Sequence, residues 1–161
     1  NEEKTIYRIV KTVQKIGSVI VVDDFSTDLT FMKSKNAGAK VIKHKFNLGY
    51  DKCISTGFRH ALNQKYDYLI SLDADGQHKY SDVKKILYYL NKDNVVVHGN
   101  RKKKQRFTEK VFSIYSNFFY GIKDPLCGLK GYNLHFFKDQ NVHSLSYIGT
   151  RYLFNAVKKK I

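Results

Sequence analysis

Hydrophobic positions along the chain follow two alternating spacings. Short apolar runs rich in β-branched residues, which predict buried strands, lie at 18–22, 40–44, 68–72 and 94–99. Apolar residues at helical spacing, which predict helices, lie in 6–16, 27–36, 51–64, 81–90 and 107–120. A loop is expected near 124–131, with shorter helices after it. This alternation predicts an α/β fold in which helices cover both faces of a mostly parallel central sheet.

The chain has 161 residues, which fits a single domain over 1–161. Its sequence opens directly with helical spacing, whereas α/β folds of this type normally open with a strand. We therefore expect a Rossmann-like domain that lacks its first strand. No repeat, linker or low-complexity tract divides the sequence, and no window approaches the roughly 20 apolar residues of a membrane span.

Acidic residues follow two of the predicted strands. Asp23 and Asp24 end the run "VIVV", and Asp73 and Asp75 follow "LISL". Ligands of an open parallel sheet bind beyond the carboxyl ends of its strands, so both acidic pairs are expected to face one crevice. Grouped carboxylates repel one another, and a divalent cation with oxygen ligands relieves that repulsion. The pattern predicts a Mg²⁺ or Mn²⁺ site that would also neutralise a diphosphate leaving group.

The same acids have a structural interpretation. The segment 23–28 would serve as a capping box for the helix that follows it. Asp73 and Asp75 would form a cap and turn cluster before a helix whose cap is expected at Ser81. A short D-x-D motif occurs by chance, so spacing alone leaves this alternative open.

Two other kinds of site fit the sequence less well. A calcium loop of the EF-hand type that started at Asp73 would need Gly at its sixth position and an acid at its twelfth, where the chain has His78 and Lys84. A phosphatase with an aspartyl nucleophile usually carries Thr or Val two places after the second acid, where this chain has Gln77.

The net charge of +15 results from 29 Lys+Arg against 14 Asp+Glu, with clusters at 101–106 and 158–160. Such a charge attracts nucleic acid, anionic lipid headgroups or charged small substrates, although basic runs are also common on solvated surfaces. A basic nucleic-acid-binding domain is the alternative from another class. It explains the charge but not the acids, and the sequence has no recognised nucleic-acid motif. Cys53 and Cys127 have no metal-ligand spacing, which indicates reduced cytosolic thiols.

The predicted helix over 107–120 is rich in aromatic residues. Most of them are expected to pack in the core, and a subset could form an interfacial patch beside the basic run. They are Phe107, Phe112, Tyr115, Phe118, Phe119 and Tyr120.

Several segments, in order, resemble glycosyltransferase family two, whose inverting enzymes have the GT-A fold and use nucleotide sugars. "VIVVDDFSTDLT" is similar to the VDDGSTD segment of that family, with Phe25 where Gly is usual. "NLGYDKCISTGFRHAL" resembles NxGxxxAxxxG, "YDYLISLDADGQH" the DxD segment, and "GNR" the GSR segment. "DPLCGLKGYN" resembles D-x-x-C/S-G-F-K/R, with Leu129 for Phe, and the opening "NEE" resembles the end of the PxYNE loop.

The resemblance covers almost the whole chain and implies a GT-A catalytic domain truncated at both ends. The closest resemblance is to the polyprenyl-phosphate (dolichyl- or undecaprenyl-phosphate) hexosyltransferases. It implies a metal-dependent enzyme that moves a hexose from a UDP- or GDP-sugar to a lipid phosphate at the cytosolic face of an anionic membrane. The protein would be cytoplasmic, peripheral to the membrane or tethered by segments outside this chain. A saccharide hydroxyl acceptor in cell-surface polysaccharide synthesis is the alternative, and no nucleic-acid partner is expected.

The resemblance implies roles for the acids on the donor side. Asp23 would hydrogen-bond the base or ribose, and Glu2 would support the base. The nucleotide site is also expected to include Asp24 and Asp73. Asp73 and Asp75 would hold Mg²⁺ or Mn²⁺, with Asp75 as the more direct ligand.

The resemblance places Arg101 and Asp124 at the catalytic centre. Arg101 would contact an acceptor or donor phosphate, because a guanidinium group suits phosphate oxygens. Asp124 would be the general base for a hydroxyl acceptor; with an ionised phosphate acceptor it would only position Lys130 or the loop. Gln77, His78 and Lys130 are candidates for contacts with the sugar or a phosphate.

Overall fold

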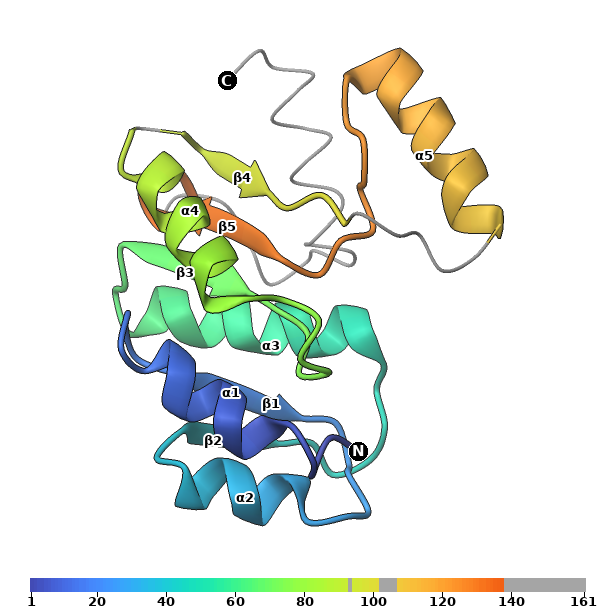
Figure 1. Cartoon of the computed structure of the whole chain (residues 1–161). Helices are drawn as coiled ribbons and strands as arrows, with labels where there is room; N and C mark the ends of the chain where they lie inside the picture. Colours follow the sequence, from blue (N-terminus) through green and yellow to red (C-terminus); the bar gives the residue numbers. More distant parts are fainter. Residues whose placement is uncertain (93, 102–106, 138–161) are drawn as a thin grey trace.

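The computed structural model of the chain describes residues 1–92, 94–101 and 107–137 (Figure 1). Helices and strands alternate through most of this part. In order they are α1 (Ile6–Val13), β1 (Ile20–Asp23), α2 (Thr30–Asn36), β2 (Lys40–Lys43), α3 (Tyr50–Asn63), β3 (Tyr68–Ser71), α4 (Tyr80–Leu90), β4 (Val96–His98), α5 (Phe107–Tyr120), β5 (Lys130–Asn133) and the 3₁₀ helix η1 (Leu134–Phe137). The α/β class predicted from the sequence is confirmed, and the helices and strands predicted up to residue 120 are present.

The strands form two separate hydrogen-bonded groups. β1 pairs with β2 in parallel, from Ile20 opposite Lys40 to Asp23 opposite Lys43. β5 lies between β3 and β4 and runs antiparallel to both, so β3 and β4 share one direction. The parallel arrangement is thus interrupted by one antiparallel strand. The sequence analysis expected a loop near 124–131, because "KGYN" lacks the apolar run that marks a buried strand.

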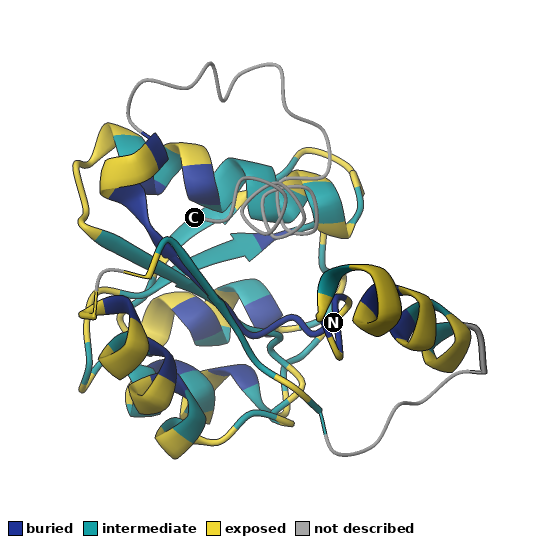
Figure 2. Cartoon of the chain, turned by 90° about the horizontal axis from the view of Figure 1, so that it is seen from above, coloured by how far each residue is buried: buried dark blue, intermediate teal, exposed yellow. Residues whose placement is uncertain are grey.

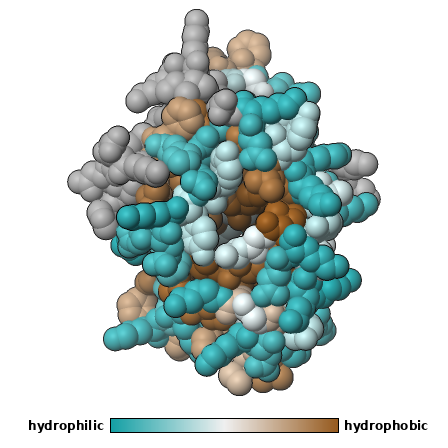
Figure 3. All heavy atoms as spheres, turned by 90° about the vertical axis from the view of Figure 1, so that its left-hand side faces the viewer, coloured by the Kyte–Doolittle hydropathy of each residue, from teal (hydrophilic) through white to brown (hydrophobic). Residues whose placement is uncertain are grey.

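β1 and β3 lie side by side without pairing. Their first residues line one cavity of about 330 Å³, which apolar side chains of α1, α4 and the two strands enclose. Figure 3 shows this cavity as a hollow with hydrophobic walls. Both strand edges that face the hollow are unpaired within the described residues.

β5 carries much of the core although its sequence is short. All four of its residues are buried. Tyr132 packs edge-on against Phe58 of α3, with ring centroids 5.4 Å apart, and Phe137 packs against Phe58 at 5.5 Å. Leu134 completes this cluster. The packing holds β5, and the loop that leads into it, against the end of β3.

Helix starts differ from the expected caps. The backbone N–H of Thr30, the first residue of α2, donates to Asp28 over 3.0 Å, so Asp23 and Asp24 do not cap this helix. Ser81 lies inside the first turn of α4, and the residue that closes this turn is Asp82, which accepts from the Lys79 N–H over 3.0 Å. Asp23 and Asp24 are therefore available for other contacts.

The aromatic helix α5 does not pack as expected, because small polar residues are buried and several aromatic side chains are exposed. Its buried residues are Ser113 and Ser116, whereas Phe118 is 81% exposed and Phe119 is 61% exposed. Tyr115 is also exposed. Figure 1 shows α5 standing away from the sheet, and Figure 2 shows exposed positions along most of it. The prediction that most of these aromatic residues pack in the core is wrong for these three.

Some expectations fall outside the described residues. They concern the basic runs at 102–106 and 158–160, the side chain of Phe107 and the shorter helices after residue 137. Within the described part, no helix combines the length and the hydropathy needed to cross a membrane.

Candidate active site

A cleft of about 290 Å³ opens where β1 and β3 end. Asp23 and Asp24 line it from the end of β1, and Ala74, which lies between Asp73 and Asp75, lines it from the end of β3. The first acidic pair thus lines the cleft, and the residue between the two members of the second pair reaches it. The roles expected of these acids in a donor site stay predictions. Glu2 lines the same cleft.

The first residues of the chain close one side of this cleft. The Glu2 N–H donates to Oγ1 of Thr30 over 2.7 Å, which ties this segment to α2. The Thr5 hydroxyl donates to the carbonyl oxygen of Ala74 over 2.6 Å, which ties it to the end of β3. These two bonds hold Glu2 beside Asp23, as its expected role in a donor site requires.

Asp23, which lines the cleft, has a buried carboxylate oxygen without a hydrogen-bond partner among the described residues. Its side chain is buried, and Oδ1 accepts from the Ser26 N–H over 3.3 Å. Oδ2 has no hydrogen-bond partner among the described residues, and its nearest cation is Lys43 at 4.0 Å. A buried carboxylate oxygen without a donor is costly. The arrangement fits a ligand that brings an N–H or O–H group to this oxygen.

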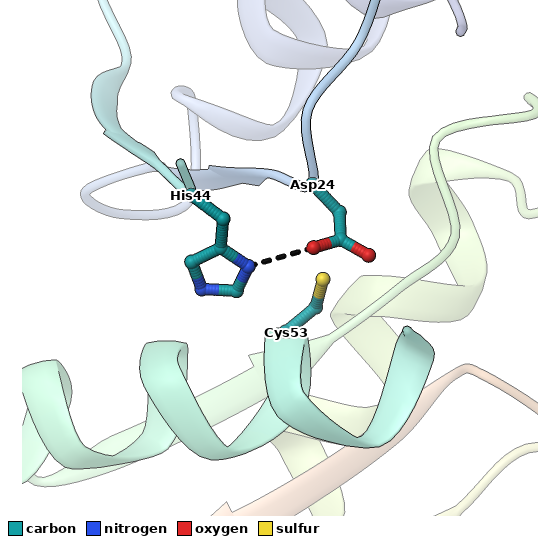
Figure 4. Close-up of side chains that lie close together, drawn as sticks. All are labelled: Asp24, His44 and Cys53. Carbon is teal, nitrogen blue, oxygen red and sulfur yellow. Dashed lines mark hydrogen bonds and ion pairs between the residues drawn. The ribbon is translucent and has the colours of Figure 1, made fainter. Parts of the chain in front are cut away.

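Asp24 makes different contacts, although it is the next residue. Its carboxylate accepts the N–H groups of Leu48, over 2.9 Å, and Gly49, over 2.7 Å, and lies 2.7 Å from Nδ1 of His44 (Figure 4). Partial burial alone would raise the pKa of Asp24, but these hydrogen bonds lower it. Gly49 has a φ of +86°, which favours glycine. Asp24 therefore holds the loop 47–49 in place.

Phe25, in the turn between the acids and α2, is where this chain differs from the resembling family segment. Phe25 has a φ of +65°, in the left-handed region where glycine costs least. The resembling segment has Gly at this position. The chain keeps the turn with an exposed Phe, whose backbone strain is about 1–2 kcal/mol.

The second acidic pair joins a half-buried carboxylate, Asp73, to an exposed one, Asp75. Asp73 packs against Gly128 so closely that a Cβ at Gly128 would lie 2.2 Å from its Oδ2. Burial raises the pKa of Asp73, and the negative charge of Asp75 raises it further. Asp75 is exposed, and its Oδ1 accepts the Gln77 N–H over 2.9 Å. Asp75 therefore stabilises a turn, as the structural interpretation of these acids predicted. Its remaining lone pairs and the Asp73 carboxylate fit a divalent cation, which would relieve the repulsion between them.

Gln77 and His78 lie on the turn that follows these acids. Gln77 is exposed, and His78 lies near enough to Asp73 for its positive form to oppose the rise in the pKa of that carboxyl group. The expected contacts of these two side chains with a sugar or phosphate remain predictions.

Arg101 and Asp124 form an ion pair with each other. The Arg101 Nε donates to Oδ2 of Asp124 over 2.9 Å, and Nη2 donates to Oδ1 over 3.0 Å. The backbone N–H of Arg101 adds a third bond to Oδ2, and Glu109 of α5 accepts from Nη2 over 3.1 Å. Asp124 is buried, so this pairing neutralises a buried charge. Arg101 was expected to contact a phosphate, and Asp124 to act as a general base or to position Lys130 or the loop; the pairing of the two was not predicted.

Lys130 lies behind Asp73 at the start of β5. It is buried, and its Nζ donates to the carbonyl oxygen of Cys127. Burial lowers the pKa of Lys130, while the nearby Asp73 and Asp124 carboxylates oppose this change. The ammonium group is therefore placed to balance the charge of Asp73 from inside the fold.

Neither cysteine is placed as a nucleophile. Burial raises the pKa of Cys53 to about 12, with the Asp24 carboxylate adding to the rise. Burial also raises the pKa of the Cys127 thiol. Both thiols are therefore protonated at neutral pH.

Several site residues were not singled out by the sequence analysis. Gly128 supports Asp73, and Tyr50, whose pKa is raised by desolvation and by the Asp73 carboxylate, lies beside it. Glu109 and His44 anchor Arg101 and Asp24. Gly128 in "DPLCGLKGYN" was a usable signal for a close approach of another side chain to the backbone. The other contacts join positions far apart in the sequence.

The packing of Asp73 on Gly128 gives a direct prediction. Gly128→Ala is expected to turn the Asp73 carboxylate away from its position, because the new Cβ would overlap its oxygens. Metal-dependent nucleotide binding should weaken at least about 10-fold, as loss of a supported ligand does. Calorimetric titration of Mn²⁺ and UDP or GDP measures this. Gly17→Ala is the matched control, since nothing lies within 4 Å of its new methyl group. Equal binding by both variants would contradict the assigned packing.

The fold and this cleft together define a class of protein. It is an α/β domain with a cleft at its strand ends, which the acids Glu2, Asp23 and Asp24 line. The chain belongs to glycosyl transferase family 2, because the model of that family matches residues 1–151. The resemblance inferred from the sequence is thereby confirmed.

Two curated relatives match most of the chain. An uncharacterised protein of Methanocaldococcus jannaschii is 34% identical over an alignment of 161 residues. The alignment covers 86% of this chain and 70% of the relative. A UDP-N-acetylglucosamine–dolichyl-phosphate N-acetylglucosaminyltransferase of Methanococcus voltae is 29% identical over 165 residues, with coverages of 83% and 66%.

Solved structures share the fold at low identity. Glucosyl-3-phosphoglycerate synthase of Mycobacterium tuberculosis, crystallised with Mn²⁺ and UDP-glucose, has a TM-score of 0.67 and 20% identity, over 84% of this chain and 53% of that one. Mannosyl-3-phosphoglycerate synthase of Rubrobacter xylanophilus also has a TM-score of 0.67 and 20% identity, with coverages of 85% and 51%. The chain therefore spans about half the length of these solved chains.

Proposed function

We propose that this domain transfers a hexose, with inversion, from a nucleoside diphosphate sugar to a polyprenyl phosphate at a membrane surface. The observation that carries the proposal is the cleft at the strand ends. Asp23, Glu2 and Ala74, the residue between Asp73 and Asp75, line it together. Family membership favours this activity over the nucleic-acid-binding alternative.

The donor nucleotide is proposed to lie between the two strand ends. Asp23 offers its unsatisfied Oδ2 to an N–H or O–H of the base or ribose. Glu2 borders the same space. Asp24 acts through the loop 47–49, whose N–H groups occupy its carboxylate.

Asp73 and Asp75 are proposed to hold Mg²⁺ or Mn²⁺ together with the diphosphate of the donor. When bound, the ion supplies positive charge that stabilises the departing nucleoside diphosphate. The solved relative with Mn²⁺ and UDP-glucose supports this choice of ion class. Gly128 leaves room for the Asp73 carboxylate, and the nearby Lys130 ammonium balances its charge.

The reaction is an in-line displacement at the anomeric carbon. An oxygen of the acceptor phosphate forms the new bond to that carbon as the bond to the donor diphosphate breaks on the opposite face. An ionised phosphate needs no base, which agrees with the occupation of both Asp124 oxygens by Arg101. We propose that Asp124 positions Arg101, which faces the acceptor region as the cationic partner of the pair. Positioning and charge stabilisation then provide most of the rate.

Two observations favour a lipid-phosphate acceptor over a saccharide. The Methanococcus voltae relative is named for transfer to dolichyl phosphate. Helix α5 exposes Ile114, Phe118 and Phe119, with the exposed Lys110 on the same helix and Lys123 just after it. Apolar side chains beside basic ones fit an anionic membrane surface, and the net charge of +15 adds to the attraction. The domain is thus proposed to bind the membrane peripherally.

The test is transfer to an acceptor embedded in vesicles. The protein is mixed with UDP- and GDP-hexoses, Mn²⁺ and vesicles of anionic lipid that contain polyprenyl phosphate, and the glycolipid product is measured. Phosphoglycerate and a free oligosaccharide serve as competing acceptors. We expect product only on the polyprenyl phosphate; product only on a soluble acceptor would overturn the proposed acceptor.

A paired variant tests the role of α5. Phe118→Ser with Phe119→Ser should lower vesicle-dependent transfer roughly 10-fold, since losing apolar burial of two Phe side chains costs at least about 1.4 kcal/mol. Donor binding should stay unchanged. Tyr88→Ser with Tyr89→Ser, an exposed pair on α4, is the matched control. An equal loss in both pairs would remove α5 from the membrane contact.

A further inference from the structure

Three side chains of different elements converge beside the donor cleft. Asp24 follows β1, His44 follows β2, and Cys53 lies in the first turn of α3. One carboxylate oxygen, one ring nitrogen and the sulfur lie within 4.8 Å of one another. Figure 4 shows all three groups directed at one point. Within the described part of the chain, these three residues are the group of His, Cys, Asp or Glu side chains that lie close enough together to hold a metal ion.

His44 is already oriented as a metal ligand would be. Its Nδ1 faces Oδ1 of Asp24 over 2.7 Å, and its Nε2 faces Oγ1 of Thr56 over 3.0 Å. A histidine that binds a metal through one nitrogen normally directs the other to an oxygen of this kind. The Thr56 hydroxyl therefore fixes the ring so that Nδ1 points into the cluster. His44 is largely buried, with 9% of its side chain exposed.

We propose that Asp24, His44 and Cys53 form a Zn²⁺ site, with water as the fourth ligand. A thiolate, an imidazole and a carboxylate are the three ligand types that zinc takes in proteins, and a mixed S, N and O set favours zinc over the hard cations. Tetrahedral bonds near 2.0 Å require the nitrogen and the oxygen to lie about 3.3 Å apart. Small side-chain rotations achieve this from the hydrogen-bonded pair.

Proton changes on binding follow from the observed contacts. Asp24 can only accept, so Nδ1 carries the hydrogen of the 2.7 Å contact. The ion replaces that hydrogen, the imidazole takes its proton on Nε2 and donates it to Thr56, and the Cys53 thiol loses one proton to solvent. Each ion bound therefore releases the thiol proton of Cys53. Binding strengthens as pH rises.

This site is separate from the proposed magnesium or manganese site. It shares no ligand with Asp73 and Asp75, and it contains the sulfur and nitrogen ligands that hard cations disfavour. A bound zinc ion would join the ends of β1 and β2 to α3. It would thereby clamp the loop 47–49, which Asp24 already holds at the donor cleft.

Cobalt(II) titration of the full chain tests the proposal. Cobalt(II) bound to a thiolate gives a near-ultraviolet charge-transfer band that oxygen and nitrogen ligands alone do not give. We expect one equivalent of Co²⁺ to produce this band, Zn²⁺ to displace it, and Mg²⁺ to leave it unchanged. Absence of the band in the folded protein would overturn the proposal.

Variants assign the band to individual residues. Cys53→Ser should abolish it, whereas Cys127→Ser should keep it. His44→Gln should weaken Co²⁺ binding strongly, and Thr56→Val should weaken it about 10–100-fold, as loss of an outer hydrogen bond to a ligating histidine does. Asp75→Ala should leave the band intact. A band that depends on Cys127, or that disappears in Asp75→Ala, would place the metal elsewhere.

Discussion

The Asp75→Ala variant is expected to lose manganese-dependent binding of the donor nucleotide and to keep its fold. Asp75 is exposed, and among the described residues it accepts a hydrogen bond from the Gln77 N–H, so its loss should lower the free energy of unfolding by less than about 1 kcal/mol. Removing a direct ligand costs more than the 10–100-fold of an outer contact, so affinity should fall about 100-fold or more. Calorimetry with UDP and GDP, with and without Mn²⁺, measures this change.

An acid at the other end of the same strand provides the control. Asp67 precedes β3 and is largely exposed, with an ion pair to His135 over 3.0 Å. Asp67→Ala removes the same charge from the protein, far from the proposed ion. Its donor binding should match that of the unchanged protein. Retained manganese dependence in Asp75→Ala would remove this residue from the metal site.

Arg101→Ala is expected to destabilise the domain by about 3–5 kcal/mol. The change leaves the buried Asp124 without the guanidinium that neutralises it, and an uncompensated buried charge has a cost of this size. The pair also links the chain before α5 to the chain after it, and Glu109 ties Arg101 to α5 itself. Denaturant unfolding followed by circular dichroism measures the loss.

A double variant separates the charge effect from simple loss of packing. Arg101→Ala with Asp124→Ala should be more stable than Arg101→Ala alone, because the second change removes the unpaired charge. Lys110→Ala, on the exposed surface of α5, should change stability by less than about 0.5 kcal/mol. A single variant as stable as the unchanged protein would show that the pair carries little energy. The effect of Arg101 on acceptor use is then best measured with Arg101→Lys, which keeps the charge.

The sequence predicted the parts of the site that depend on local order. Strand-ending acids such as Asp23 and Asp73 follow apolar runs, and the carboxyl ends of parallel strands meet at one edge. This rule alone placed both pairs at one edge of the fold, and the structure places Asp23, Asp24 and Ala74, the residue between Asp73 and Asp75, at one cleft there. The order of short motifs then indicated the family, which the family model confirmed.

Other features could not be predicted because they depend on contacts between distant positions. β5 is a strand because β3 and β4 flank it, although its residues lack an apolar run. The exposure of Phe118 depends on which side of α5 meets the domain, and the buried side carries Ser113 and Ser116. Asp24 and His44 are neighbours only through the pairing of β1 with β2.

The most direct test of the central claim is a crystal structure of the protein with Mn²⁺ and a nucleoside diphosphate, using anomalous scattering to locate the ion. We expect one manganese peak bound by Asp75 and Asp73 and by the diphosphate, with the base or ribose at Oδ2 of Asp23. A nucleotide bound outside this cleft, or a manganese peak that neither acid contacts, would contradict the proposed donor site.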